Sequence, residues 1–199
     1  MRISILKKNP MIYSCNVYLI RGDWNKIDDI NTLIDVGIDG FIIDELNGFS
    51  TGVGKKRVEQ VILTHEHFDH AGGLKKIYHE YKPIVYAYSK FDFVSTVMKD
   101  GMYIKTGDKY SMIIHTPGHS NDSVCIYNEE EQILFSGDIA ININTVDNSY
   151  TNNYVIALER LTKLKIKTIF PGHEAPITKN AEEILKNSFN NVIKSKILD

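Results

Sequence analysis

The residues best suited to do chemistry lie in one short segment, 64–70. Three of the seven histidines, His65, His67 and His70, fall within six residues there, together with Asp69. His65 and His67 are two residues apart, so at the extended end of a strand both side chains point to the same side. Asp69 and His70 come where the chain turns into a helix, so they point to a second, adjacent place. Imidazole and carboxylate groups bind zinc and similar first-row ions. The segment therefore offers two pairs of ligands for two neighbouring ions.

Two pairs of ligands do not complete two metal sites, and three later segments offer one further ligand each. His119, Asp138 and His173 each follow a β-rich segment and a glycine. A glycine beside a ligand at the end of a rigid strand keeps the backbone out of the path of the ligating side chain. We therefore expect these three residues to complete the two sites.

The elements that must position these residues follow from apolar periodicity and from Gly and Pro breakers. Strands are expected over 3–6, 16–20, 32–37, 57–63, 84–87, 102–115, 124–127, 132–136 and 167–170. Helices are expected over 41–49, 71–81, 90–98 and 154–164, and a last helix capped by Thr178 is expected to run to the C-terminus. The polar, Asn-rich segment 139–153 is either a plain connection or a loop over the active site, in which case Tyr150 lines the pocket.

Composition sets the class of protein. With 199 residues, 43% of them hydrophobic, the chain is expected to form a single domain over 1–199. Its formal net charge of −2 provides no electrostatic footprint for nucleic acid, so we expect a small-molecule substrate and leave a homodimer open. The two cysteines, Cys15 and Cys125, lie in apolar runs and suit a reducing cytoplasm. No apolar run reaches membrane-spanning length, and the charged N-terminus is unlike a signal peptide.

In order and spacing, these motifs resemble the metallo-β-lactamase superfamily. The match is His-x-His-x-Asp-His, then His119, Asp138 and His173, and the opening strands around 16–20 and 33–37 are also similar. The resemblance implies an α/β fold, a four-layer αβ/βα sandwich of two mixed β-sheets with helices outside. It implies that the first ion is bound by His65, His67 and His119, the second by Asp69, His70 and His173, and both by a bridging Asp138. It also implies a supporting role beside the site for Asp35.

The expected chemistry is hydrolysis. Two divalent ions roughly 3.5–4 Å apart can share one water molecule and lower its pKa from 15.7 to about 7, which yields a hydroxide nucleophile at neutral pH. Asp69 could also accept a hydrogen bond from that hydroxide and orient it, which would make Asp69 a catalytic residue. Zinc is the expected metal, and iron or manganese suits the same ligands.

The motifs define the substrate class less closely than they define the metal ligands. The pattern is closest to the glyoxalase II-like members, which implies a thioester, and an ester or similar carbonyl substrate suits the same chemistry. Lactonase members share His-x-His-Phe-Asp-His-Ala-Gly-Gly but commonly carry a Tyr three residues after the bridging Asp, where this chain has Ile141. An iron-dependent persulfide dioxygenase is an alternative with the same ligands. A non-enzymatic protein stapled by its metals is a third, disfavoured by the complete ligand set.

Overall fold

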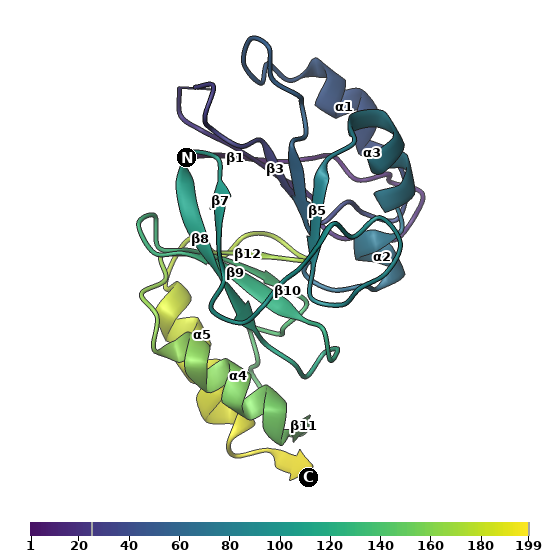
Figure 1. The fold of residues 1–199 in the computed structure, drawn as a ribbon. Helices are drawn as coiled ribbons and strands as arrows, with labels where there is room; N and C mark the ends of the chain where they lie inside the picture. Colours follow the sequence, from purple (N-terminus) through teal and green to yellow (C-terminus); the bar gives the residue numbers. More distant parts are fainter. Residues whose placement is uncertain (25, 199) are drawn as a thin grey trace.

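A computed structural model describes residues 1–24 and 26–198, and two mixed β-sheets organise them (Figure 1). The first sheet has the strand order β1-β2-β3-β4-β5-β6. Its strands are β1 (Arg2–Ile5), β2 (Tyr18–Arg21), β3 (Thr32–Ile34), β4 (Gln60–Ile62), β5 (Ile84–Ala87) and β6 (Thr96–Val97). The first three pair antiparallel, whereas β3 to β6 pair parallel. The carboxyl ends of β3 and β4 therefore meet at the same edge of the sheet.

The second sheet has the strand order β12-β10-β9-β8-β7. Its strands are β7 (Tyr103–Thr106), β8 (Lys109–His115), β9 (Val124–Asn128), β10 (Ile133–Gly137) and β12 (Thr168–Pro171). The consecutive strands from β7 to β10 pair antiparallel, and β12 joins β10 in parallel. The carboxyl ends of β10 and β12 thus also lie together. A separate parallel pair joins β11 (Ser149–Thr151) to β13 (Lys196–Leu198).

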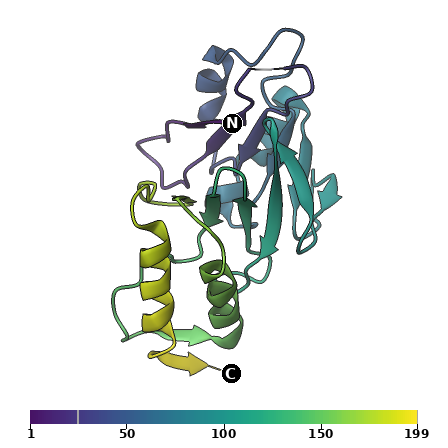
Figure 2. The same cartoon turned by 90° about the vertical axis from the view of Figure 1, so that its left-hand side faces the viewer.

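Five helices accompany the sheets in the part of the chain that the structure describes. They are α1 (Ile42–Gly48), α2 (Phe68–Ala71), α3 (Leu74–Tyr81), α4 (Asn152–Thr162) and α5 (Ala181–Val192). Helices α1 and α3 lie on the outer side of the first sheet, and α4 and α5 lie side by side below the second sheet (Figures 1 and 2). Among the described residues, no helix is long and apolar enough to cross a membrane.

The alternation of side chains along the strands builds three apolar layers. In β2, Leu19 packs with the α1 and α3 side chains, whereas Tyr18 and Ile20 pack between the two sheets. Phe135 of β10 fills the same inter-sheet core from the opposite side, while Leu134 faces the cluster around α4 and α5. Three cores between four layers confirm the predicted αβ/βα sandwich.

Two predicted helical stretches differ in the structure. Segment 90–98 is not a helix: Phe93 has a left-handed φ of 69°, and Thr96–Val97 forms β6 beside β5. Its β-branched residues favour a strand, and the Ser95 amide hydrogen-bonds to the Val85 carbonyl at 2.9 Å. Thr178 does not cap the last helix, because α5 begins after Asn180, and the chain past α5 returns as strand β13.

Candidate metal centre

The first sheet supplies four of the candidate ligands. Strand β4 ends at Ile62, and His65 and His67 follow in extended chain before helix α2 carries Asp69 and His70. Two backbone hydrogen bonds hold this helix in place: the Cys15 amide donates to the Asp69 carbonyl at 3.2 Å, and the Val36 amide donates to the His70 carbonyl at 2.9 Å. His65, Asp69 and His70 are buried, whereas His67 is exposed.

The second sheet supplies the other three. His119 lies in the loop between β8 and β9, Asp138 follows β10, and His173 follows β12. Gly172 explains how closely these segments can approach: a Cβ at this position would lie 2.2 Å from Asp138 Oδ1 and 2.7 Å from His70 Cε1. A glycine, which has no Cβ, lets this backbone lie against the side chains of Asp138 and His70.

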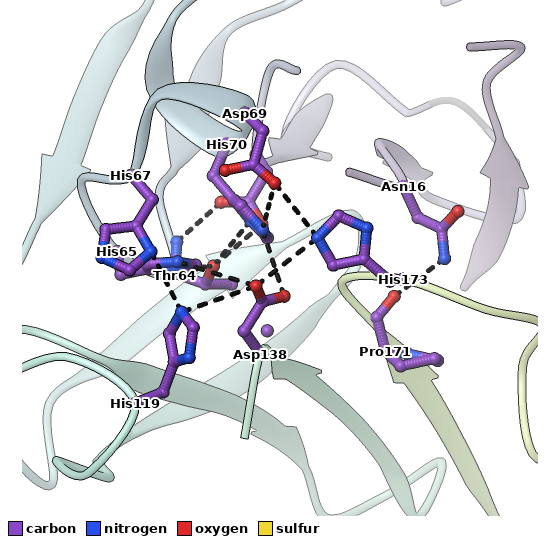
Figure 3. Close-up of polar contacts among 12 residues, drawn as sticks. Asn16, Thr64, His65, His67, Asp69, His70, His119, Asp138, Pro171 and His173 are labelled. Atoms are coloured by element: carbon purple, nitrogen blue, oxygen red, sulfur yellow. Dashed lines mark hydrogen bonds and ion pairs between the residues drawn. The ribbon is translucent and has the colours of Figure 1, made fainter. Parts of the chain in front are cut away.

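All seven predicted residues converge on one centre between the sheets (Figure 3). The potential ligand atoms of His65, His67 and His119 lie within 4.8 Å of one another, and His119 Nε2 is 3.0 Å from His67 Nδ1. The same 4.8 Å limit encloses a second group, which consists of Asp69, His70, Asp138 and His173. The grouping matches the two sets that the sequence resemblance implies.

Asp138 belongs to the second group and also lies close to the first. Its Oδ2 is 3.6 Å from His119 Nε2 and 3.9 Å from His65 Nε2, both in the first group. The same carboxylate is 3.1 Å from His70 Nε2 through Oδ1 and 3.4 Å from His173 Nε2 through Oδ2. Oδ2 thus lies near imidazoles of both groups and Oδ1 lies near His70, which is the position that a bridging ligand requires.

Asp35 supports the centre from behind. It directly follows β3, has a left-handed φ of 59° and is 2% exposed. Its Oδ1 accepts the Thr64 amide at 2.7 Å, and its Oδ2 accepts the Thr64 hydroxyl at 2.9 Å. Asp35 Oδ2 is also 2.8 Å from His70 Nδ1. This contact fixes the proton on Nδ1 and leaves Nε2 of His70 to face Asp138.

The side chains of the centre shift one another's pKa values strongly. Burial lowers the pKa of His65 to about 4, and the neighbouring His70 adds to the effect. Burial also lowers the pKa of His70, but the carboxylates of Asp35 and Asp138 outweigh it and raise that pKa overall. Burial raises the pKa of Asp138, yet His70 and the other imidazoles bring it down to about 2. Asp138 is therefore a carboxylate at neutral pH.

Three buried polar atoms at the centre have no hydrogen-bond partner among the described residues. They are Nε2 of His65, Nε2 of His70 and Oδ1 of Asp138. The last two are 3.1 Å apart and form an ion pair when His70 is protonated. Buried polar groups without partners are rare in native proteins. Imidazole nitrogens and carboxylate oxygens that converge in this way fit a divalent metal ion, which would satisfy all three atoms.

Two cavities open beside the centre, and both are lined by His119, Asp138 and Ala140. The first has a volume of about 240 Å³ and includes the apolar side chains of Ile139, Ile141 and Ile177. The second includes Tyr150, whose ring stacks on Tyr154 with centroids 5.1 Å apart. Segment 139–153 thus lines both cavities with some of its residues. Its Ile139, Ile141 and Ile143 side chains are also buried in the core against α4 and α5.

Sequence reasoning missed the residues that join the two sheets around the centre. The Asn16 side chain donates to the carbonyls of Pro171 and Glu174 at 3.0 and 2.8 Å (Figure 3). Asp122 accepts the amide of Glu66 at 2.9 Å. Both contacts hold a ligand-bearing segment of one sheet against the other sheet. A single Asn or Asp with no repeated spacing carries no signal of such a role in sequence.

Residues 12–97 and 107–173 match the family model described as the metallo-beta-lactamase superfamily. The match includes all seven residues of the centre, and the chain belongs to this superfamily. The family resemblance predicted from the motifs is therefore confirmed.

Three curated relatives are hydrolases or thioesterases by name. Hydroxyacylglutathione hydrolase from Francisella tularensis subsp. novicida is 34% identical over 60% of this chain and 51% of its own length. Acyl-coenzyme A thioesterase MBLAC2 from Bos taurus is 26% identical over 92% of this chain and 80% of its own length. Atrochrysone carboxyl ACP thioesterase from Aspergillus novofumigatus is 29% identical over 88% of this chain and 55% of its own length. The chain thus spans about half the length of the Francisella and Aspergillus relatives.

Solved structures agree on the fold. ETHE1 from Myxococcus xanthus has a TM-score of 0.72 and 20% identity, with 97% of this chain and 88% of that chain covered. A flavoprotein from Thermotoga maritima has a TM-score of 0.66 and 26% identity, with 87% of this chain and 51% of that chain covered. Both comparisons support the two-sheet sandwich around the centre.

Proposed function

We propose that this protein is a dinuclear metal-dependent hydrolase of acyl thioesters. The observation that carries the proposal is the convergence of seven side chains in two adjacent groups, with Asp138 between them. Two divalent ions, when bound, supply Lewis acidity that polarises a carbonyl group and lowers the pKa of water to about 7. The named relatives, a hydroxyacylglutathione hydrolase and two thioesterases, favour a thioester over other carbonyl substrates.

Each side chain has a distinct part in this proposal. His65, His67 and His119 would hold one ion, and Asp69, His70 and His173 would hold the other. Asp138 would contribute to both, because its carboxylate lies near imidazoles of both groups.

Two carboxylates have a further part in the proposal, Asp35 beside a ligand and Asp69 as a ligand itself. Asp35 Oδ2 accepts a hydrogen bond from the Nδ1–H of His70, which directs Nε2 toward the metal that the centre would hold. Asp69 Oδ2 lies 3.1 Å from His173 Nε2, and the carboxylate accepts a hydrogen bond from the attacking water and orients it.

The substrate binds across the two cavities beside the centre. Ile139, Ile141 and Ile177 offer the acyl group an apolar wall in the first cavity, where burial of apolar surface contributes about 25 cal/mol per Å². Tyr150 in the second cavity contacts the other side of the thioester. We propose zinc as the metal and a cytoplasmic location, which the buried, unpaired Cys15 and Cys125 support.

Metal analysis of the protein purified from its native host, followed by a substrate panel, tests the proposal. The panel contains a thioester, a lactone, a phosphodiester and a persulfide. We expect two ions per chain and fastest turnover of the thioester. One iron per chain with oxidation of the persulfide would instead establish a dioxygenase.

A pair of histidine variants sharpens the test. Loss of a residue that only supports a metal ligand lowers metal affinity or activity about 10–100-fold. His67 is a ligand itself, so His67→Ala should lower activity about 100-fold or more. His79→Ala is the matched control, because His79 is exposed on α3 and outside both groups. Full activity of metal-loaded His67→Ala would overturn the assignment.

A further inference from the structure

The side chain of Tyr13 lies against the centre although no motif includes it. Its ring stacks on the His173 imidazole with centroids 4.9 Å apart and an interplanar angle of 16°. Its phenolic oxygen is 3.3 Å from His173 Nε2. That same nitrogen is 3.1 Å from Asp69 Oδ2 and 3.4 Å from Asp138 Oδ2. The phenol therefore reaches the atom of His173 that faces the proposed metal position.

Burial does not explain this placement. Tyr13 is 67% exposed, and its neighbours Met11 and Ile12 are also exposed, at 88% and 43%. A ring that remains mostly in water contributes little to the apolar core. Its stacking on His173 instead places the phenolic hydroxyl, a hydrogen-bond donor, where the centre meets solvent.

The backbone after Tyr13 fixes its position. The Cys15 amide donates to the Asp69 carbonyl at 3.2 Å, and the Asn16 amide donates to the Gly172 carbonyl at 2.6 Å. The chain therefore passes between the segments that carry Asp69 and His173 within three residues of Tyr13. These two bonds keep the backbone that carries Tyr13 beside the two ligand-bearing segments.

We propose that Tyr13 is a catalytic residue that donates a hydrogen bond to the substrate carbonyl oxygen as that oxygen gains negative charge. This inference rests on the proposed function. Once His173 Nε2 binds a metal ion, it has neither a lone pair nor a proton for the phenol, so the phenol turns to another acceptor. The carbonyl oxygen of a substrate bound at the centre would be such an acceptor, because the phenolic oxygen lies 3.3 Å from His173 Nε2. Burial and the nearby carboxylates of Asp69 and Asp138 raise the pKa of the Tyr13 phenol above its ordinary value, so the phenol keeps its proton at neutral pH. No bond to Tyr13 forms or breaks.

The test compares Tyr13→Phe with wild type in the metal-loaded full-length chain. Phenylalanine keeps the ring that stacks on His173 and removes only the donor. We expect kcat on the best thioester to fall about tenfold or more while KM stays within about twofold, because the donor acts in the transition state. Metal content should be unchanged. Tyr103→Phe is the matched control, because Tyr103 is 59% exposed on β7.

Binding of two inert analogues gives a readout that is independent of turnover. A trifluoromethyl ketone analogue of the thioester becomes a tetrahedral hydrate with an oxyanion, whereas the matching methyl ketone stays planar. Tyr13→Phe should weaken the trifluoromethyl ketone about tenfold and leave the methyl ketone unchanged, an outcome that a merely structural role would not produce.

Three results separate the possible failures. Equal kcat and equal analogue affinities in Tyr13→Phe and wild type would overturn the role of Tyr13 alone. Loss of metal from Tyr13→Phe would overturn it in favour of a role in metal retention. Absence of thioester turnover by the metal-loaded wild type would reject the proposed function itself.

Discussion

Replacing Asp35 by asparagine tests how the centre is held in place. Asparagine has almost the same shape and tolerates the left-handed φ of 59° at this position. Its carbonyl oxygen can still accept the Thr64 amide, which now bonds Asp35 Oδ1 at 2.7 Å. The amide nitrogen then replaces Oδ2, which lies 2.8 Å from His70 Nδ1. Two donors thus face each other, unless His70 moves its proton from Nδ1 to Nε2.

Both outcomes weaken metal binding by His70. If the proton stays on Nδ1, a buried donor has no partner, which costs about 1–3 kcal/mol of folding free energy. If the proton moves to Nε2, that nitrogen cannot bind a metal until the proton returns. Supporting residues of this kind contribute about 10–100-fold in metal affinity. At about 1.4 kcal/mol per tenfold change, the expected loss is about 1.4–2.8 kcal/mol for the group that contains His70.

The assay is competition with a chelating indicator, read together with urea unfolding of the metal-free protein. We expect one of the two ions to bind about 10–100-fold more weakly in Asp35→Asn, and the other to be less affected. Asp44→Asn on the exposed side of α1 is the control for a change of one charge. Two unchanged metal affinities together with unchanged unfolding would refute the reasoning about the His70 proton.

Two further predictions use the packing around the centre. Gly172→Ala should lose at least one bound ion per chain, because the new Cβ would lie 2.2 Å from Asp138 Oδ1. The metal content of the purified variant measures this loss. Gly48→Ala is the control, since a Cβ added at Gly48 would have no neighbouring atom within 4 Å. Full metal content in Gly172→Ala would contradict the close approach. Burial raises the pKa of Cys15 to about 11 and that of Cys125 to about 12, so neither thiol should react with a disulfide reagent at pH 8 until the chain unfolds. Fast labelling of the folded protein would show that these thiols are accessible.

The strand ends of the fold and the residues of the centre were predictable from sequence for a physical reason. Side chains that follow parallel strands meet at one edge of a sheet, and glycines mark the close approaches. His119, Asp138 and His173 each follow a glycine, and the structure brings them together with segment 64–70. Asp35 was predicted beside the site from the family resemblance, and its contacts with Thr64 and His70 now explain that position.

The remaining features depend on contacts between distant segments, which local patterns do not encode. Tyr13 and Asn16 act through neighbours more than 150 positions away in the chain. Segment 90–98 has apolar residues that suit a helix, but pairing with β5 makes part of it a strand. Strand β13 exists only because β11 lies beside it.

The division of the centre between the two sheets has a consequence for the order of assembly. The first sheet carries His65, His67, Asp69 and His70, and the other three residues arrive with the second sheet. A chain in which β12 has not yet docked beside β10 presents an incomplete set and should bind metal weakly. Ions that prefer the complete set draw partly folded chains toward the native state by mass action. Metal supply would then govern the yield of folded protein as well as its activity.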